Sequence, residues 1–145
     1  MAPVMRLDVD DIRTRLEPLF ERPEIGLVVL FGSRARGTAH GGSDVDLGVL
    51  SDGEVFPLEG EVMHRLGTGR VDLVDLRRVS PLLAMAVARE GIPLYEDAPG
   101  RFASFAGLAL RRYNDTARFR RLRHRRLREY LRDRGLGPAA ETGTR

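Results

Sequence analysis

Residues 31–50 read FGSRARGTAHGGSDVDLGVL and place a Gly-Ser pair ten residues before an Asp-x-Asp pair. The preceding apolar run IGLVVLF predicts a buried strand over 25–31 that stops at Gly32. Glycine allows the backbone to turn closely around an anion, and the Ser33 hydroxyl and the turn's amides can hold a phosphate. We therefore expect a phosphate-binding turn at Gly32 and Ser33.

The second half of this segment predicts a strand over 43–50 that presents two carboxylates on one face. Side chains alternate along a strand, so Asp44 and Asp46 point the same way, roughly 7 Å apart, while the apolar residues between and after them point the other way. Like charges at this separation repel, and a divalent cation such as Mg²⁺ offsets that repulsion while preferring carboxylate and phosphate oxygens. The pair is a candidate metal platform, and the loop over 33–42 is long enough to wrap a triphosphate.

A third carboxylate is available in RVDLVDL, residues 70–76. Asp72 and Asp75 fall on opposite faces of this predicted strand, so only one of them can join the platform. We favour Asp72 because Asp75 lies at the strand's end beside Arg77 and Arg78, although a shifted register would select Asp75. Three acids around one or two metal ions indicate in-line displacement at phosphorus, with Asp72 assisting removal of a proton from the attacking hydroxyl.

The pattern over residues 25–76 resembles the minimal nucleotidyltransferases of the DNA-polymerase-β-like superfamily, whose motif is Gly-Ser, ten residues, Asp-x-Asp and a later acid on a neighbouring strand. Together with the tail LRRYNDTARFRRLRHRRLREYL, it resembles the MNT-domain antitoxins of bacterial HEPN/MNT toxin–antitoxin pairs. That resemblance implies transfer of AMP from ATP to a tyrosine of a partner HEPN-domain ribonuclease, which is thereby silenced. It also implies a hetero-oligomer with that toxin.

Carried over to this sequence, the resemblance assigns the triphosphate to Gly32 and Ser33. It assigns Mg²⁺ binding and catalysis to three acids, Asp44, Asp46 and Asp72. Arg34 and Ser43 are further candidates for nucleotide binding, and Arg36 lies close to them; guanidinium groups bind phosphate well. The structural alternatives are an ordinary turn at Gly-Ser, a solvated strand face for the acids, and exposed loop arginines.

Composition is compatible with this interpretation. A chain of 145 residues with 42% hydrophobic residues suits one domain with a sizeable core. The absence of cysteine excludes disulfides and thiolate zinc sites. No apolar run approaches a membrane span, and the N-terminus lacks a signal-peptide core, so we expect a soluble cytoplasmic protein without membrane contact. The three histidines have no metal-ligand spacing and are expected at the surface: His40, His64 and His124.

We expect an α+β fold, with a polymerase-β-like nucleotidyltransferase core in which a small mixed sheet is flanked by helices, and with a C-terminal helical extension. Helical spacing follows Asp8, although Pro18 should kink or end that helix. A short helix is predicted over 58–66. Ser80 and Pro81 should begin another helix that ends at Gly91, and 92–96 suggests an edge strand.

Charge divides the chain into two parts. Residues 1–97, the predicted nucleotidyltransferase domain, contain 11 arginines and 17 acids, whereas residues 98–145 contain 13 arginines and four acids. All 24 basic residues are arginine. The basic extension over 98–134 is expected to pack on the core or on a partner, and 135–145 is expected to be disordered.

Within the extension, we predict one helix up to Arg112 or Tyr113 and a break at Asn114-Asp115 before a second helix. The second helix has an approximate apolar stripe among eight arginines, formed by Phe119, Leu122, Leu127, Tyr130 and Leu131. Docking to the toxin, contact with RNA phosphates and packing against the core are competing interpretations.

Two alternatives to protein adenylylation stay open. One is a non-catalytic antitoxin that neutralises its partner by steric binding, although three acids at this spacing argue against it. The other is an aminoglycoside-type adenylyltransferase, although 145 residues leave little room for a further substrate-binding domain.

Overall fold

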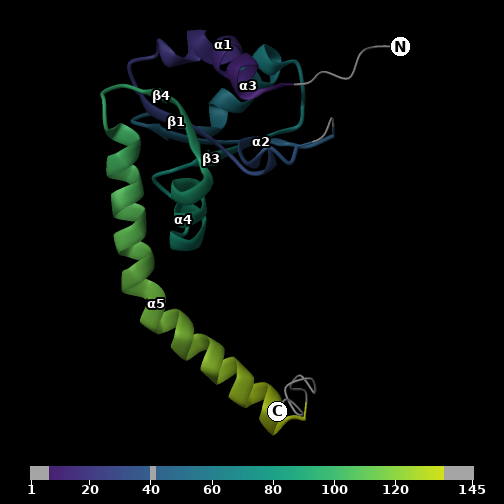
Figure 1. The fold of residues 1–145 in the computed structure, drawn as a ribbon, viewed down its shortest axis with the longest axis vertical. Coiled ribbons are helices and arrows are strands. Elements are labelled where there is room, and N and C mark those ends of the chain that lie inside the picture. The colour runs from purple at the N-terminus through teal and green to yellow at the C-terminus, as the bar shows by residue number, and fades with distance from the viewer. Residues whose placement is uncertain (1–6, 40–41, 136–145) are drawn as a thin grey trace.

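A computed structural model describes residues 7–39 and 42–135 of the chain and shows a four-stranded mixed sheet (Figure 1). The strand order is β3-β2-β1-β4, in which β1 runs antiparallel to β2 and β4, and β2 runs parallel to β3. The strand bounds are β1 Ile25–Phe31, β2 Val45–Ser51, β3 Val71–Asp75 and β4 Ile92–Glu96. The predicted α+β class and the small mixed sheet flanked by helices are confirmed.

One face of the sheet is covered by α1 (Val9–Phe20) and α3 (Glu59–Leu66), the latter preceded by the 3₁₀ turn η1 (Phe56–Leu58). The first helix begins with a capping box in which the Asp8 carboxylate accepts a hydrogen bond from the backbone amide of Asp11, at 2.8 Å. Apolar residues at helical spacing then become fully buried against the sheet: Ile12, Leu16 and Leu19.

Pro18 lies in the last turn of α1, and the helix continues past it to Phe20. Its missing amide therefore removes only a terminal backbone bond.

The opposite face is covered by α4 (Pro81–Glu90) and by the first turns of α5 (Arg101–Asp133). Ser80 caps α4, since its hydroxyl accepts a hydrogen bond from the Leu83 amide at 3.2 Å, and Gly91 follows the helix as predicted. Beneath these helices lies a second, smaller apolar cluster, formed by Leu27, Val29, Leu76 and Val87.

The C-terminal extension is one continuous helix, so the predicted break at Asn114-Asp115 is wrong. Neither residue is a glycine or proline, and their low helix propensity alone does not stop a helix. The carbonyl of Tyr113 instead accepts hydrogen bonds from the Thr116 hydroxyl at 3.1 Å and from Arg120 at 2.9 Å. Such bonding by threonine often bends a helix, and α5 bends partway along its length as it leaves the body (Figure 1).

His64 and His124 are exposed as expected, while His40 and the predicted disordered segment beyond Gly135 lie outside the described residues. Among the residues that the structure describes, no helix has the length and apolar character needed to cross a membrane.

Candidate active site

The turn after β1 is built around Gly32, which adopts φ +76° and ψ −157°. A side chain would be strained there, and a Cβ atom at this position would lie 2.1 Å from Oδ2 of Asp46. The chain then enters the single-turn helix α2 (Ser33–Arg36), which ends at Gly37. The segment 33–42, predicted as a loop, therefore begins with helix; four residues are too few to give a recognisable helical pattern.

The second acid of the Asp-x-Asp pair lies directly against this turn. Asp46 is in β2, where its register partner on β1 is Phe31, the residue before Gly32. The close approach of its carboxylate to Gly32 is possible only because glycine has no side chain. Asp44 lies one residue before β2, since the strand begins at Val45 rather than at the predicted residue 43. Asp44 is exposed and Asp46 is half-buried.

The third acid is placed by the parallel pairing of β2 with β3. Asp72 is the direct register partner of Asp46, so the two side chains share one face of adjacent strands. Asp75 lies opposite Val49 instead, and its carboxylate accepts a hydrogen bond from the Arg77 amide at 3.0 Å. The register thus brings Asp72, and not Asp75, beside Asp46.

The three carboxylates interact electrostatically. Burial is the largest cause of a raised pKa at Asp46, and the charges of Asp72 and Asp44 raise this pKa further. Arg36 opposes these effects. The edge formed by the Gly32 turn and the starts of β2 and β3 is therefore a site where negative charge accumulates against a backbone turn.

Within residues 7–39 and 42–135, no group of three or more histidine, cysteine, aspartate or glutamate side chains has the arrangement needed to hold a metal ion without rearrangement. The chemistry of the donors nevertheless fits a hard divalent cation, because all three are carboxylates. The space that a Cβ would fill at Gly32 is taken by the Asp46 carboxylate, so the turn holds this carboxylate close to the backbone.

A large part of the chain matches a known protein family. Residues 15–99 match the family described as polymerase beta, nucleotidyltransferase, and this segment contains the Gly-Ser turn, the Asp-x-Asp pair and Asp72. The chain belongs to this nucleotidyltransferase family. Members generally use a nucleoside triphosphate and a divalent metal.

Two similar proteins are named protein adenylyltransferase MntA. The one from Aphanizomenon flos-aquae is 34% identical over 105 residues, which cover 62% of this chain and 69% of that protein. The one from Shewanella oneidensis is 36% identical over 77 residues, which cover 50% of this chain and 55% of that protein. The matched segments thus span between about half and two thirds of the length of these relatives.

Solved structures extend the similarity beyond the nucleotidyltransferase domain. A toxin–antitoxin crystal structure with AMP-PNP contains a chain with TM-score 0.70 and 28% identity, covering 83% of this chain and 98% of that one. A structure of tri-AMPylated Shewanella oneidensis HEPN toxin in complex with MNT antitoxin gives TM-score 0.66 at 23% identity, covering 82% and 98%. The second match shows the fold alone.

Arg34 and Arg36, the arginines near the Gly-Ser turn of this nucleotidyltransferase, contact other parts of the protein. The Arg34 guanidinium donates hydrogen bonds to the backbone carbonyls of Leu7 at 3.1 Å and Ser43 at 3.0 Å. These bonds favour a structural role for Arg34, which ties the start of the described chain to the segment before β2; its binding to phosphate stays a prediction. Arg36 is more exposed and pairs with Glu90 at 2.9 Å.

The sequence analysis did not predict a cavity on the α5 side of the sheet, which is lined by Leu50, Leu76 and residues of α5. Its lining comes from four separated parts of the chain, so no local pattern in the sequence could have indicated it.

Proposed function

We propose that this chain is a Mg²⁺-dependent protein adenylyltransferase that transfers AMP from ATP to a tyrosine of a cognate HEPN-domain toxin, a ribonuclease, and so neutralises it as its antitoxin. The observation that carries the proposal is the register of Asp46 with Asp72 beside the Gly32 turn, in a chain 34% identical to a protein adenylyltransferase. Because such a pair acts on ATP and intracellular RNA, we place it in the cytoplasm.

In the proposed reaction, the tyrosine oxygen of the toxin attacks the α-phosphorus of ATP. A phosphorus–oxygen bond to tyrosine forms, the bond from the α-phosphorus to the bridging oxygen breaks, and diphosphate leaves. The Gly32 turn and Ser33 hold the triphosphate, and Asp72 accepts the tyrosine proton. Asp44, Asp46 and Asp72 would hold Mg²⁺, which supplies neutralisation of the triphosphate charge and polarises the reacting groups. The pKa of Asp46 is raised mainly by burial and further by the charges of Asp72 and Asp44, and a bound cation would relieve that repulsion.

The extension over residues 98–134 is proposed to bind the partner through its far half. Four large hydrophobic side chains are exposed there: Phe119, Leu122, Leu127 and Tyr130. Exposed apolar side chains grouped on one element often mark a protein interface. The first turns of α5, by contrast, pack on α4 and the sheet.

A small-molecule adenylyltransferase of the aminoglycoside type is less well supported. Similar proteins are named protein adenylyltransferases, which favours a protein acceptor.

The test is transfer of label from α-labelled ATP to the toxin encoded with this chain. The double variant Asp44→Asn with Asp46→Asn should abolish labelling, and Asp72→Asn should reduce its rate by about 100-fold or more, the usual contribution of a general base. Retained labelling by the double variant would refute the metal assignment.

Asp75→Asn is the matched control, because Asp75 lies on the same strand but does not pair with Asp46 in the register. It should retain labelling once its folding has been verified by circular dichroism. The double variant also separates catalysis from occlusion: a catalytic antitoxin loses protection of cells against the toxin, whereas an antitoxin that acts by steric binding still protects at stoichiometric amounts.

A further inference from the structure

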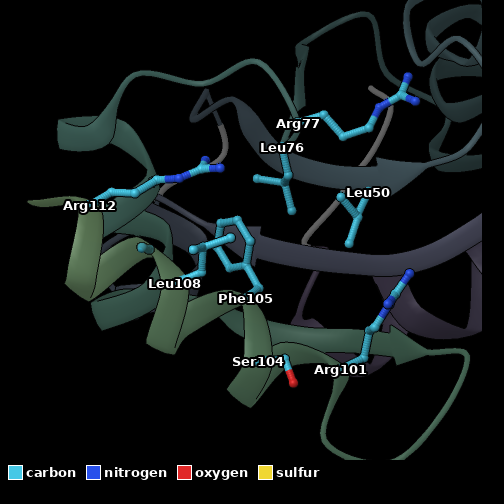
Figure 2. A pocket seen from close by; sticks show the side chains of 10 residues that line it. Leu50, Leu76, Arg77, Arg101, Ser104, Phe105, Leu108 and Arg112 are labelled. Atoms are coloured by element: carbon cyan, nitrogen blue, oxygen red, sulfur yellow. The ribbon is translucent and has the colours of Figure 1, made fainter.

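A cavity of about 310 Å³ lies between α5 and the C-terminal ends of β2 and β3, on the sheet face that α4 and α5 cover. Its floor is apolar and is formed by Leu50, Leu76, Phe105 and Leu108. Figure 2 shows these side chains facing the cavity, while Ser104 points away from it. The cavity has the size of a small binding pocket and an apolar lining suited to a large hydrophobic group.

Three arginines surround this apolar floor, and we call the whole feature the arginine-rimmed pocket. Arg77 lies 3.6 Å from Asp75, and Arg101 lies 3.4 Å from Asp97, so each has an acidic neighbour. The Arg112 side chain forms no hydrogen bond or ion pair with any residue that the structure describes. It reaches from α5 toward Leu76 (Figure 2). The rim therefore has an excess of positive charge, with Arg112 available for a new partner.

The chemistry of the pocket specifies an occupant that is apolar with an adjacent carboxylate. The floor stabilises a buried aliphatic or aromatic side chain, and a guanidinium group forms paired hydrogen bonds with a carboxylate. A polar anion alone would leave the apolar floor uncovered.

The arginine-rimmed pocket shares a sheet face with the candidate active site. Asp46, Gly48 and Leu50 alternate along this face of β2, and four residues of strand span about 13 Å. Gly48 allows Leu76 to lie close to the strand, since a Cβ there would be 2.7 Å from Leu76. One bound protein is large enough to contact the pocket and the carboxylates together.

We propose that the arginine-rimmed pocket is a docking site for the protein that accepts AMP, and that it receives an apolar side chain flanked by an aspartate or glutamate of that protein. The proposal rests on the proposed function, because it assumes a protein acceptor. Docking at this site holds the acceptor while its tyrosine lies at the carboxylates.

The charge on the rim is tested with Arg112→Glu in the full chain, using the HEPN-domain protein encoded with it. Reversing the charge should weaken complex formation and raise the KM for this acceptor by at least about tenfold, with little change in kcat. Arg111→Glu is the matched control, since it makes the same charge change at the neighbouring exposed position, outside the pocket lining. The control should bind and react like the unmodified chain.

A photoreactive phenylalanine analogue at position 108 identifies the occupant directly. Leu108 is 40% exposed, so the substitution is tolerable at this site. The crosslink should join the pocket to an apolar residue of the acceptor that has an acidic neighbour. A crosslink to a second copy of this chain, or to an acceptor segment without acidic residues, would overturn the proposal.

These measurements separate docking from catalysis. If the unmodified chain transfers no AMP to the toxin, the proposed function fails, and the binding measurements still report whether the pocket holds that protein. If transfer occurs but Arg112→Glu and Arg111→Glu give the same KM and affinity, docking at the pocket is wrong while the proposed function stands. A loss of ATP affinity in Arg112→Glu would show a nucleotide site instead of a docking site.

Discussion

The first helix and the far half of the last helix have similar apolar spacing and opposite surroundings. In α1, Ile12, Leu16 and Leu19 are completely buried against the sheet. In α5, Phe119 is 67% exposed and Tyr130 is 51% exposed. An amphipathic pattern therefore predicts a helix with an apolar face, but the rest of the fold determines whether that face is buried. The body provides a sheet for α1, whereas the far half of α5 extends away from it (Figure 1).

The largest contrast is expected in stability. Leu47→Ala should lower the free energy of unfolding by about 2–5 kcal/mol, because Leu47 is fully buried in the body and its removal leaves a cavity. Leu127→Ala, at a side chain that is 53% exposed in α5, should change it by no more than about 0.5 kcal/mol. Urea denaturation of both variants measures the difference. Equal losses would show that the far half of α5 packs as tightly as the body.

Deletion of the chain from residue 116 tests whether the far half of α5 contributes to toxin binding but not to ATP binding. The buried apolar residues of the described chain all precede residue 110, so the shortened protein should keep its fold and its affinity for ATP. Its affinity for the toxin should fall by at least about tenfold, because the exposed apolar side chains of α5 are removed. Calorimetric titrations with ATP and with the toxin measure both effects. Unchanged toxin affinity would contradict partner docking by α5, and a salt-dependent loss of RNA binding would favour RNA contact instead.

The same contrast explains what the sequence could predict. Alternation along the strand showed that only one of Asp72 and Asp75 could join the other two acids, and the position of Asp75 beside two arginines favoured Asp72. The turn at Gly32 followed from the end of an apolar run. Long-range pairing was needed to place Asp72 opposite Asp46, and the motif spacing alone could not supply that register.

The features that the sequence predicted wrongly or not at all lie where local sequence preferences are weak or where distant segments meet. Asn114-Asp115 resembles a helix break, but a helix continues through such residues when no glycine or proline stops it. The short helix α2 lacks enough residues to show periodicity. The arginine-rimmed pocket combines Leu50, Leu76 and residues of α5, which meet only after folding.

Within the body, the ion pairs of Glu61 predict a pH-dependent contribution to stability. Its hydrogen bond with Arg65 is the largest cause of a lowered pKa, and the charge of Arg22 lowers it further. A lowered carboxyl pKa stabilises the fold above the unfolded value of 4.5, and this contribution is lost as the pH falls through the folded pKa. Glu61→Gln should cost about 1 kcal/mol at neutral pH, since both arginines are partly solvated.

Denaturation at several pH values measures this effect. The difference between Glu61→Gln and the unmodified protein should disappear once the pH is below the folded pKa of Glu61. A difference that stays constant with pH would assign the effect to packing rather than to charge. Arg78→Gln is a suitable control, because Arg78 is 68% exposed and its contacts with acids exceed 3.6 Å.

The smallest expected effect is a gain in stability, at Asp46 in the candidate active site, whereas the other stability predictions are losses. The folded pKa of Asp46 is raised above its ordinary value of 3.8, so the folded state holds this proton to higher pH and loses stability as the pH rises through that interval. Near neutral pH the charged carboxylate therefore destabilises the metal-free fold, and Asp46→Asn should raise the Tm slightly in the presence of EDTA. The gain should vanish below the ordinary carboxyl pKa and should reverse when Mg²⁺ and ATP stabilise only the unmodified protein. A variant less stable than the unmodified protein in EDTA would mean that the Asp46 carboxylate supports the Gly32 turn structurally, rather than being held there for a cation.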